Sequence, residues 1–230
     1  MGTKMPMNHT GQEQSTVVSR PTLTLMPKPS YFQQKGDIKP PVKYSSFKRN
    51  DPLGIGGKGL WRIHSGYVRT LSWTLEGELV PLGFWGAGDI IGYPITQTSP
   101  YAAKCLSPVQ AEYLGTAYGC SQGMMLSQVR QSHDLLKISH CRQADLRLLQ
   151  FICWMAGRFG QRTSEGRTLK LRLTHQEISE AINLTRVTVS RLLKALEREG
   201  KIRWTPSEKM VYQETFKEFY ANLDSCDRIY

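Results

Sequence analysis

Two arginines five positions apart, Arg186 and Arg191, lie in a segment whose apolar residues recur with the period of a helix. A guanidinium group can donate two hydrogen bonds to O6 and N7 of guanine, the commonest specific contact in the major groove. Val187 offers an apolar contact to a thymine methyl, and the Ser190 hydroxyl can donate to a base edge. These residue types on one helix face predict that the segment reads DNA bases.

A second set of polar residues surrounds this face and could contact the DNA backbone. His175 and Gln176 begin the preceding helical segment, where free backbone N–H groups favour a phosphate. Lysines and arginines nearby add attraction that does not depend on sequence. The full set of backbone candidates is Thr174, His175, Gln176, Thr185, Thr188, Lys194, Lys201 and Arg203.

Two short helices must position these side chains. Thr174 and Glu177 have the spacing of a capping box at the start of the first helix, and Asn183 can adopt the left-handed conformation that ends it. Thr185 can cap the second helix. Residues 201–213 then read as a strand, a Pro-Ser turn and a strand, which predicts a winged helix-turn-helix. The core positions expected in the second helix are Val189, Leu192, Leu193 and Leu196.

The first half of the chain has a different texture. Short β-type runs broken by glycines fill residues 45–120, with a hairpin signal at Glu76-Gly77, and favour a β-sandwich or jelly-roll barrel. Residues 121–160 carry an apolar stripe at helical spacing, which predicts one or two helices. That stripe could pack on the barrel, or part of it could form a dimer seam; its residues are Leu149, Ile152, Ala156 and Phe159, widened by Leu148, Phe151 and Met155. In the same stretch Leu126, Val129, Leu136 and Gln143 give a loose heptad with polar interruptions. Residues 157–167 read as a polar, glycine-bearing linker.

The charge is concentrated in two places. The chain carries 30 basic and 19 acidic residues, a net charge of +11. Residues 1–50 hold +6 of this and residues 161–205 hold +5, which favours an anionic partner. Residues 1–44 are rich in polar residues and proline, so we expect a flexible basic tail that increases solubility. The bulk of the positive charge therefore accompanies the DNA-reading segment and the tail.

Cysteine usage and hydropathy indicate the cellular compartment. The five cysteines lack metal-ligand spacing, which argues against a metal site or a disulfide framework. No leader and no run of about 18 apolar residues is evident. We therefore expect a cytoplasmic protein without a membrane partner.

The order of these elements resembles the Crp/Fnr regulators, and LTHQEISEAINLTRVTVSRLLKALEREG is similar to their cyanobacterial nitrogen-control branch. The resemblance implies an α+β fold: after the tail, an N-terminal β-roll like the cyclic-nucleotide-binding jelly roll (45–120), connecting and dimerisation helices (121–160) and a C-terminal winged helix-turn-helix with an extension (161–230). Family members are homodimers that bind palindromic double-stranded DNA, contact RNA polymerase and take a signal in the β-roll. Arg186 and Arg191 match the family's base-reading arginines, and Val187 replaces the glutamate of the cAMP-responsive branch.

The effector site departs from the cAMP-responsive branch. GDIIG is followed by Tyr93-Pro94 in place of glutamate, and Ser99-Pro100 stands where an Arg-Ser pair is expected. We therefore expect no cAMP binding and no cofactor. An iron–sulfur cluster is not expected because residues 1–104 lack cysteine, and the lone His64 and His140 read as ordinary histidines rather than haem ligands. An acidic metabolite such as 2-oxoglutarate, or no small-molecule effector at all, remain open. The candidate pocket residues are Tyr93, Ser99, Tyr101 and Lys104.

Three other functions compete with a sequence-specific regulator. A cupin-type barrel enzyme would need clustered metal ligands, and the barrel offers His64 with scattered glutamates, so we expect no enzyme. A non-specific DNA-coating or architectural protein is favoured by the basic tail, and would lose affinity with salt equally on every sequence. A protein-docking winged helix is disfavoured by the outward-facing pair Arg186 and Arg191.

Overall fold

The computed structural model describes residues 44–54, 59–115, 119 and 121–226, with side chains described as far as Ala221. These residues all fall within one compact unit, residues 39–230. Of the predicted tail, only Tyr44 belongs to the described part of the chain, where it begins the first strand.

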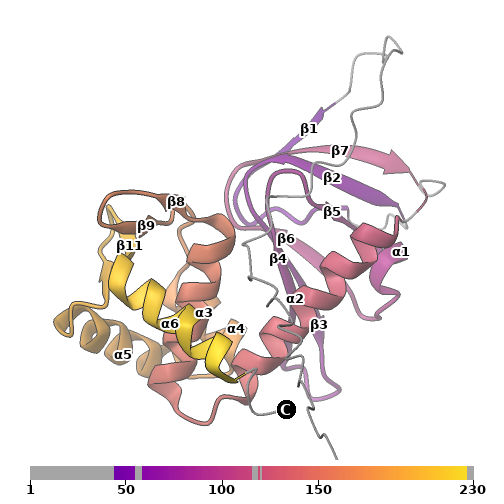
Figure 1. Cartoon of the computed structure of the whole chain (residues 1–230). Helices are drawn as coiled ribbons and strands as arrows, with labels where there is room; N and C mark the ends of the chain where they lie inside the picture. The colour runs from indigo at the N-terminus through magenta and orange to yellow at the C-terminus, as the bar shows by residue number, and fades with distance from the viewer. Residues whose placement is uncertain (1–43, 55–58, 116–118, 120, 227–230) are drawn as a thin grey trace, which may run out of the picture. The chain divides into compact units, whose positions relative to one another are not determined.

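Two antiparallel sheets form the first half of the described chain (Figure 1). One has the strand order β1-β7-β2-β5 and the other β4-β3-β6, so strands distant in sequence lie side by side. This arrangement confirms the β-roll and the α+β fold class. The strands are β1 (Tyr44–Phe47), β2 (Leu60–Ser65), β3 (Val68–Trp73), β4 (Leu79–Trp85), β5 (Ile90–Ile91), β6 (Ala102–Cys105) and β7 (Val109–Gly115).

The core of the β-roll draws on both sheets. Ile63 of β2 is buried together with Val68, Trp85 and Cys105 of the other sheet. The indole N–H of Trp85 donates to Thr70 Oγ1 at 2.9 Å, so this buried ring has its hydrogen-bond partner. The predicted hairpin at Glu76-Gly77 joins β3 to β4, with Gly77 in the left-handed region at φ 83°. Burial of these apolar side chains makes the sheets a stable base for the helices that follow.

Helices occupy the middle of the chain. They are α1 (Tyr93–Thr96), which the sequence did not predict, α2 (Gln122–His140) and α3 (Ala144–Phe159). The stripe predicted over 121–160 is therefore two helices. Gln131 of α2 accepts a hydrogen bond from the Phe84 backbone N–H of β4 at 2.6 Å, which ties α2 to the β-roll. The buried face of α3 carries Leu148, Phe151, Ile152, Cys153, Met155 and Ala156.

The C-terminal part holds the winged helix-turn-helix. A four-stranded sheet of order β10-β11-β9-β8 packs with three helices around one apolar core that also includes α3 (Figure 1). The predicted strand, Pro-Ser turn and strand are confirmed as β10 and β11. The elements are α4 (His175–Ile182), α5 (Arg186–Arg198), α6 (Gln213–Cys226), β8 (Gln161–Arg162), β9 (Gly166–Thr168), β10 (Ile202–Trp204) and β11 (Lys209–Tyr212).

The predicted linker at 157–167 is wrong in its secondary structure. Helix α3 continues to Phe159, and β8 and β9 then form a hairpin whose second strand pairs with β11. A Cβ on Gly166 would lie 2.0 Å from the Val211 carbonyl oxygen, so this glycine permits the close pairing. A glycine that signals a loop in the sequence here allows close strand contact.

Candidate nucleic-acid interface

Helix α4 begins and ends as the sequence predicts. The Thr174 hydroxyl accepts from the Glu177 backbone N–H at 3.1 Å, and the Glu177 carboxylate accepts from the Thr174 backbone N–H at 2.7 Å. The reciprocal bonds confirm the capping box. Asn183 takes the left-handed conformation at φ 51°, ψ 57° and so directs the chain into the next helix.

Helix α5 separates an apolar face from a polar one. Thr185 caps it by accepting from the Thr188 backbone N–H at 3.1 Å. Its buried side chains are Val189, Leu193 and Leu196, while Leu192 is half-buried. The predicted core positions are thus largely confirmed, and the opposite face is left to solvent.

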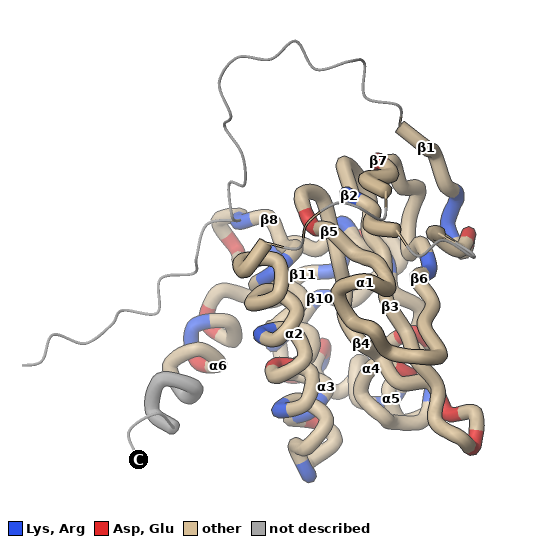
Figure 2. The backbone as a smooth tube through the Cα atoms, turned by 90° about the vertical axis from the view of Figure 1, so that its right-hand side faces the viewer, with Lys and Arg blue, Asp and Glu red and all other residues tan. Residues whose placement is uncertain are grey.

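Three of the four base-reading candidates are exposed on that opposite face. Arg186 and Arg191 are exposed, and Val187 has 77% of its surface accessible. An exposed valine between two exposed arginines gives this face both directional hydrogen-bond donors and an apolar contact. Such a face fits a major groove, which admits one helix. Figure 2 marks the basic and acidic positions along the described backbone.

Ser190, the fourth candidate, is half-buried and engaged within the motif. Its hydroxyl donates to the Arg186 carbonyl at 2.9 Å and lies 2.7 Å from Nδ1 of His175. The hydroxyl proton is therefore used inside the motif, and its remaining role toward DNA is as an acceptor. Burial, and then the positive charges of Arg186 and Lys209, lower the pKa of His175.

The backbone candidates fall into two groups. Thr174, Gln176, Thr185 and Lys194 are exposed, and Thr188 is half-buried beside Thr185, with their hydroxyls 2.8 Å apart. Two other cations have acidic partners: Lys201 lies 2.7 Å from Glu199, and Arg203 of the wing contacts both Glu208 and Glu165. Partial neutralisation reduces the attraction that Lys201 and Arg203 can offer a phosphate.

The structure does not bring the effector-pocket candidates together on one face. Tyr101 packs against the β-roll core, where burial raises the pKa of its hydroxyl, whereas Lys104 lies on the face of β6 opposite the buried Ala103 and Cys105. Tyr93 of α1 and Ser99 are exposed. A cleft of 640 Å³ lies elsewhere, bounded by the β3–β4 hairpin, α2 and α4.

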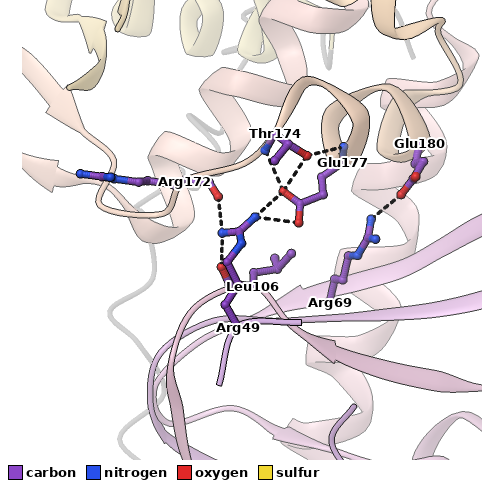
Figure 3. A network of polar contacts seen from close by, with 7 residues as sticks. All are labelled: Arg49, Arg69, Leu106, Arg172, Thr174, Glu177 and Glu180. Atoms are coloured by element: carbon purple, nitrogen blue, oxygen red, sulfur yellow. Dashed lines mark hydrogen bonds and ion pairs between the residues drawn. The ribbon is translucent and has the colours of Figure 1, made fainter. Parts of the chain in front are cut away.

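Sequence reasoning missed two ion pairs that join the β-roll to α4 (Figure 3). Arg49 lies 2.8 Å from Glu177, and Arg69 lies 2.6 Å from Glu180. The partners are separated by 128 and 111 residues. No local pattern signals contacts over such separations, so only the folded chain reveals them.

Other kinds of site find no support in the described residues. They contain no group of three or more potential metal ligands among His, Cys, Asp and Glu. In the same part of the chain, no helix combines the length and the apolar character needed to cross a bilayer.

The winged helix-turn-helix has known relatives. A model of the Crp-like helix-turn-helix domain matches residues 146–212. Regulatory protein CysR of Synechococcus elongatus is 36% identical over 157 residues, covering 67% of this chain and 76% of CysR. The chain belongs to the Crp/Fnr family of transcription regulators. Electron transport regulator A of Shewanella oneidensis is also similar, at 29% identity over 170 residues, which covers 68% of this chain and 66% of that protein.

Solved structures agree with the fold of this Crp/Fnr regulator. A CRP/FNR-family transcriptional regulator from Thermus thermophilus superimposes with a TM-score of 0.62 at 19% identity, covering 77% of this chain and 97% of that one. The predicted resemblance to Crp/Fnr regulators near the cyanobacterial branch is therefore confirmed. Members of this family are transcription regulators and not enzymes, and a DNA-coating role is not favoured.

Proposed function

We propose that this Crp/Fnr regulator reads a palindromic operator as a homodimer, in the cytoplasm, with α5 in the major groove. The observation that carries the proposal is the free outer face of α5, with Arg186 and Arg191 exposed on either side of Val187. Two copies related by a two-fold axis would place their α5 helices in grooves about one helical turn apart. The loss of the glutamate acceptor at Val187 predicts a half-site different from that of the cAMP-responsive branch.

Selection of bound sequences from a random DNA pool tests this function. The full chain is used without added ligand, and Arg186→Ala is selected in parallel. We expect the unmodified chain to enrich a palindrome with half-sites about 10 base pairs apart, centre to centre. Absence of any enrichment, combined with equal affinity for all sequences, would favour the non-specific DNA-coating role instead.

The dimer seam is supported by large apolar side chains on α2 that stay exposed among the described residues. Met125, Leu126, Val129 and Leu136 are each 46–55% exposed, at spacings that place them along one side of the helix. An exposed apolar row of this kind marks an interaction surface. Sedimentation equilibrium should report a dimer for the unmodified chain and a monomer for Val129→Glu. A dimeric Val129→Glu protein would show that the dimer seam does not include this face of α2.

The proposed regulator differs from the cAMP-responsive branch in its effector site. The cAMP-binding residues are absent at Tyr93 and at Ser99-Pro100, so we propose that cAMP does not alter DNA affinity. A regulator of this family would act on transcription by contacting RNA polymerase once it is bound to DNA. Titration of cAMP and of 2-oxoglutarate against operator binding distinguishes a ligand-free regulator from one that senses an acidic metabolite.

A further inference from the structure

Two arginines of the β-roll are each linked to α4 through a glutamate (Figure 3). We propose that Arg49 and Arg69 are positioning residues for DNA binding, each holding in place a residue in the first turn of α4 that contacts the DNA backbone. The proposal rests on the proposed function, because it assumes that Thr174 and Gln176 meet the operator.

The first link runs from Arg49 through Glu177 to Thr174. One guanidinium nitrogen of Arg49 lies 2.8 Å from both carboxylate oxygens of Glu177. The same carboxylate accepts from the backbone N–H of Thr174 at 2.7 Å and from its hydroxyl at 3.0 Å. A second nitrogen of Arg49 donates to the Arg172 carbonyl at 2.8 Å and to the Leu106 carbonyl. Arg49 therefore holds the chain on both sides of the α4 N-terminus.

The second link runs from Arg69 through Glu180 to Gln176. Arg69 Nη1 donates to one carboxylate oxygen of Glu180 at 2.6 Å, and the other oxygen accepts from the Gln176 side-chain amide at 2.9 Å. The Arg69 side chain is buried, and its Nε has no hydrogen-bond partner among the described residues. The ion pair with Glu180 is therefore the contact that compensates the desolvated charge of Arg69.

Charge gives these links a second effect on DNA. Glu177 lies in the first turn of α4, which we predict to meet phosphates, and Glu180 follows one turn later. An unpaired carboxylate at either position would repel the phosphates. Only 8% of the Glu177 side-chain surface is exposed to solvent, so water screens its charge poorly. The ion pairs of Arg49 and Arg69 therefore neutralise the two carboxylates and also hold α4 in position.

The links also leave the reading face free. Glu177 and Glu180 face the β-roll, while Arg186, Val187 and Arg191 of α5 remain exposed. If the links held the β-roll over the exposed face of α5, they would inhibit DNA binding. The observed arrangement instead holds α4 without covering α5, so the links favour the DNA-binding state and their loss should weaken binding.

The experiment measures operator affinity and its salt dependence for full-length variants. The operator is the sequence that the unmodified chain selects from a random pool. Arg49→Ala and Arg69→Ala should each weaken operator binding about 10-fold, a typical size for coupling between distant sites. The slope of affinity against salt should change by less than one, because no phosphate contact is lost and only the repulsion by the exposed carboxylate is screened, whereas loss of an arginine that itself contacted phosphate would lower the slope by about one.

Lysine variants separate positioning from a general structural role. A lysine at position 69 can keep a single point contact to Glu180, whereas a lysine at position 49 cannot bridge Glu177 and two carbonyl groups at once. We therefore expect Arg69→Lys to retain most of the affinity and Arg49→Lys to lose it. Arg158→Ala is the matched control. It removes an ion pair between Arg158 and Asp89, which lie 3.1 Å apart and do not belong to α4, and this variant should bind normally.

The outcomes are distinguishable. Alanine variants that bind as tightly as the unmodified chain, or a salt slope reduced by one unit, would overturn the positioning role while operator selection still supports the proposed function. Failure of the unmodified chain to select any sequence would overturn the proposed function itself. If Arg49→Ala does not fold, the comparison of Arg69→Ala with Arg69→Lys decides the question alone.

Discussion

His175 Nδ1 lies 2.7 Å from Ser190 Oγ, and this contact joins the first turn of α4 to the middle of α5. The Ser190 hydroxyl donates onward to the Arg186 carbonyl at 2.9 Å, so the histidine must donate from Nδ1. A residue predicted to contact the DNA backbone therefore sets the rotamer of one predicted to read bases. We therefore expect the two helices to meet DNA as one unit.

The lowered pKa of His175 predicts opposite pH effects on folding and on DNA binding. The pKa of His175 is lower in the folded chain than in the unfolded chain. The contribution of neutral His175 to stability is therefore fully present above the unfolded pKa, and the free energy of unfolding decreases as the pH is lowered toward the folded pKa. A nearby phosphate would favour the protonated form, so operator affinity should rise over the same range.

Chemical unfolding and operator binding between about pH 7.5 and 5.5 test this prediction. His175→Gln keeps a hydrogen-bond donor toward Ser190 but cannot titrate, and both pH effects should shrink in this variant. Equal pH profiles for His175→Gln and the unmodified chain would assign the titration to another histidine.

Two valines of α5, two positions apart, should separate stability from recognition. Val189 is fully buried and Val187 is 77% exposed. Val189→Ala should lower the free energy of unfolding by about 2 kcal/mol through lost burial and a small cavity. Val187→Ala should change it by less than about 0.5 kcal/mol, yet weaken the preference for thymine at one position of the operator. Urea unfolding and pool selection on both variants give the comparison, and a reversed pattern would contradict the orientation of α5.

Features that depend on neighbouring residues could be predicted from the sequence. The capping box spans four positions, and the turn at Asn183 and the Pro-Ser turn of the wing are equally local. Contacts that depend on the folded chain could not be predicted. Arg49 meets Glu177 across 128 residues, and the pairing of Gly166 with Tyr212 converts an apparent linker into a strand. Nothing in the local pattern near Arg49 indicates a role at the DNA-binding helices.

The left-handed residue between the two helices gives a further prediction. Asn183 ends α4 at φ 51°, a conformation that costs an alanine about 1 kcal/mol and a glycine almost nothing. Asn183→Ala should therefore lower the free energy of unfolding by about that amount, while Asn183→Gly should stay near the unmodified value. Thermal or urea unfolding of the two variants measures the difference. Equal destabilisation by both would show that the Asn183 side chain contributes more than its backbone conformation.

Arg186 provides the most direct test of base reading. It lies in the first turn of α5, exposed, with its backbone carbonyl held by Ser190. Removing a bidentate contact to guanine should cost about 1–3 kcal/mol of discrimination at one base step and little affinity for random DNA. Arg198→Ala is the matched control, since Arg198 is exposed in the last turn of the same helix and was not predicted to touch bases. Competition binding with operators substituted at single positions measures both variants. An Arg186→Ala protein that loses equal affinity for operator and random DNA would instead make this arginine a phosphate contact, because only a base contact can depend on which base is present.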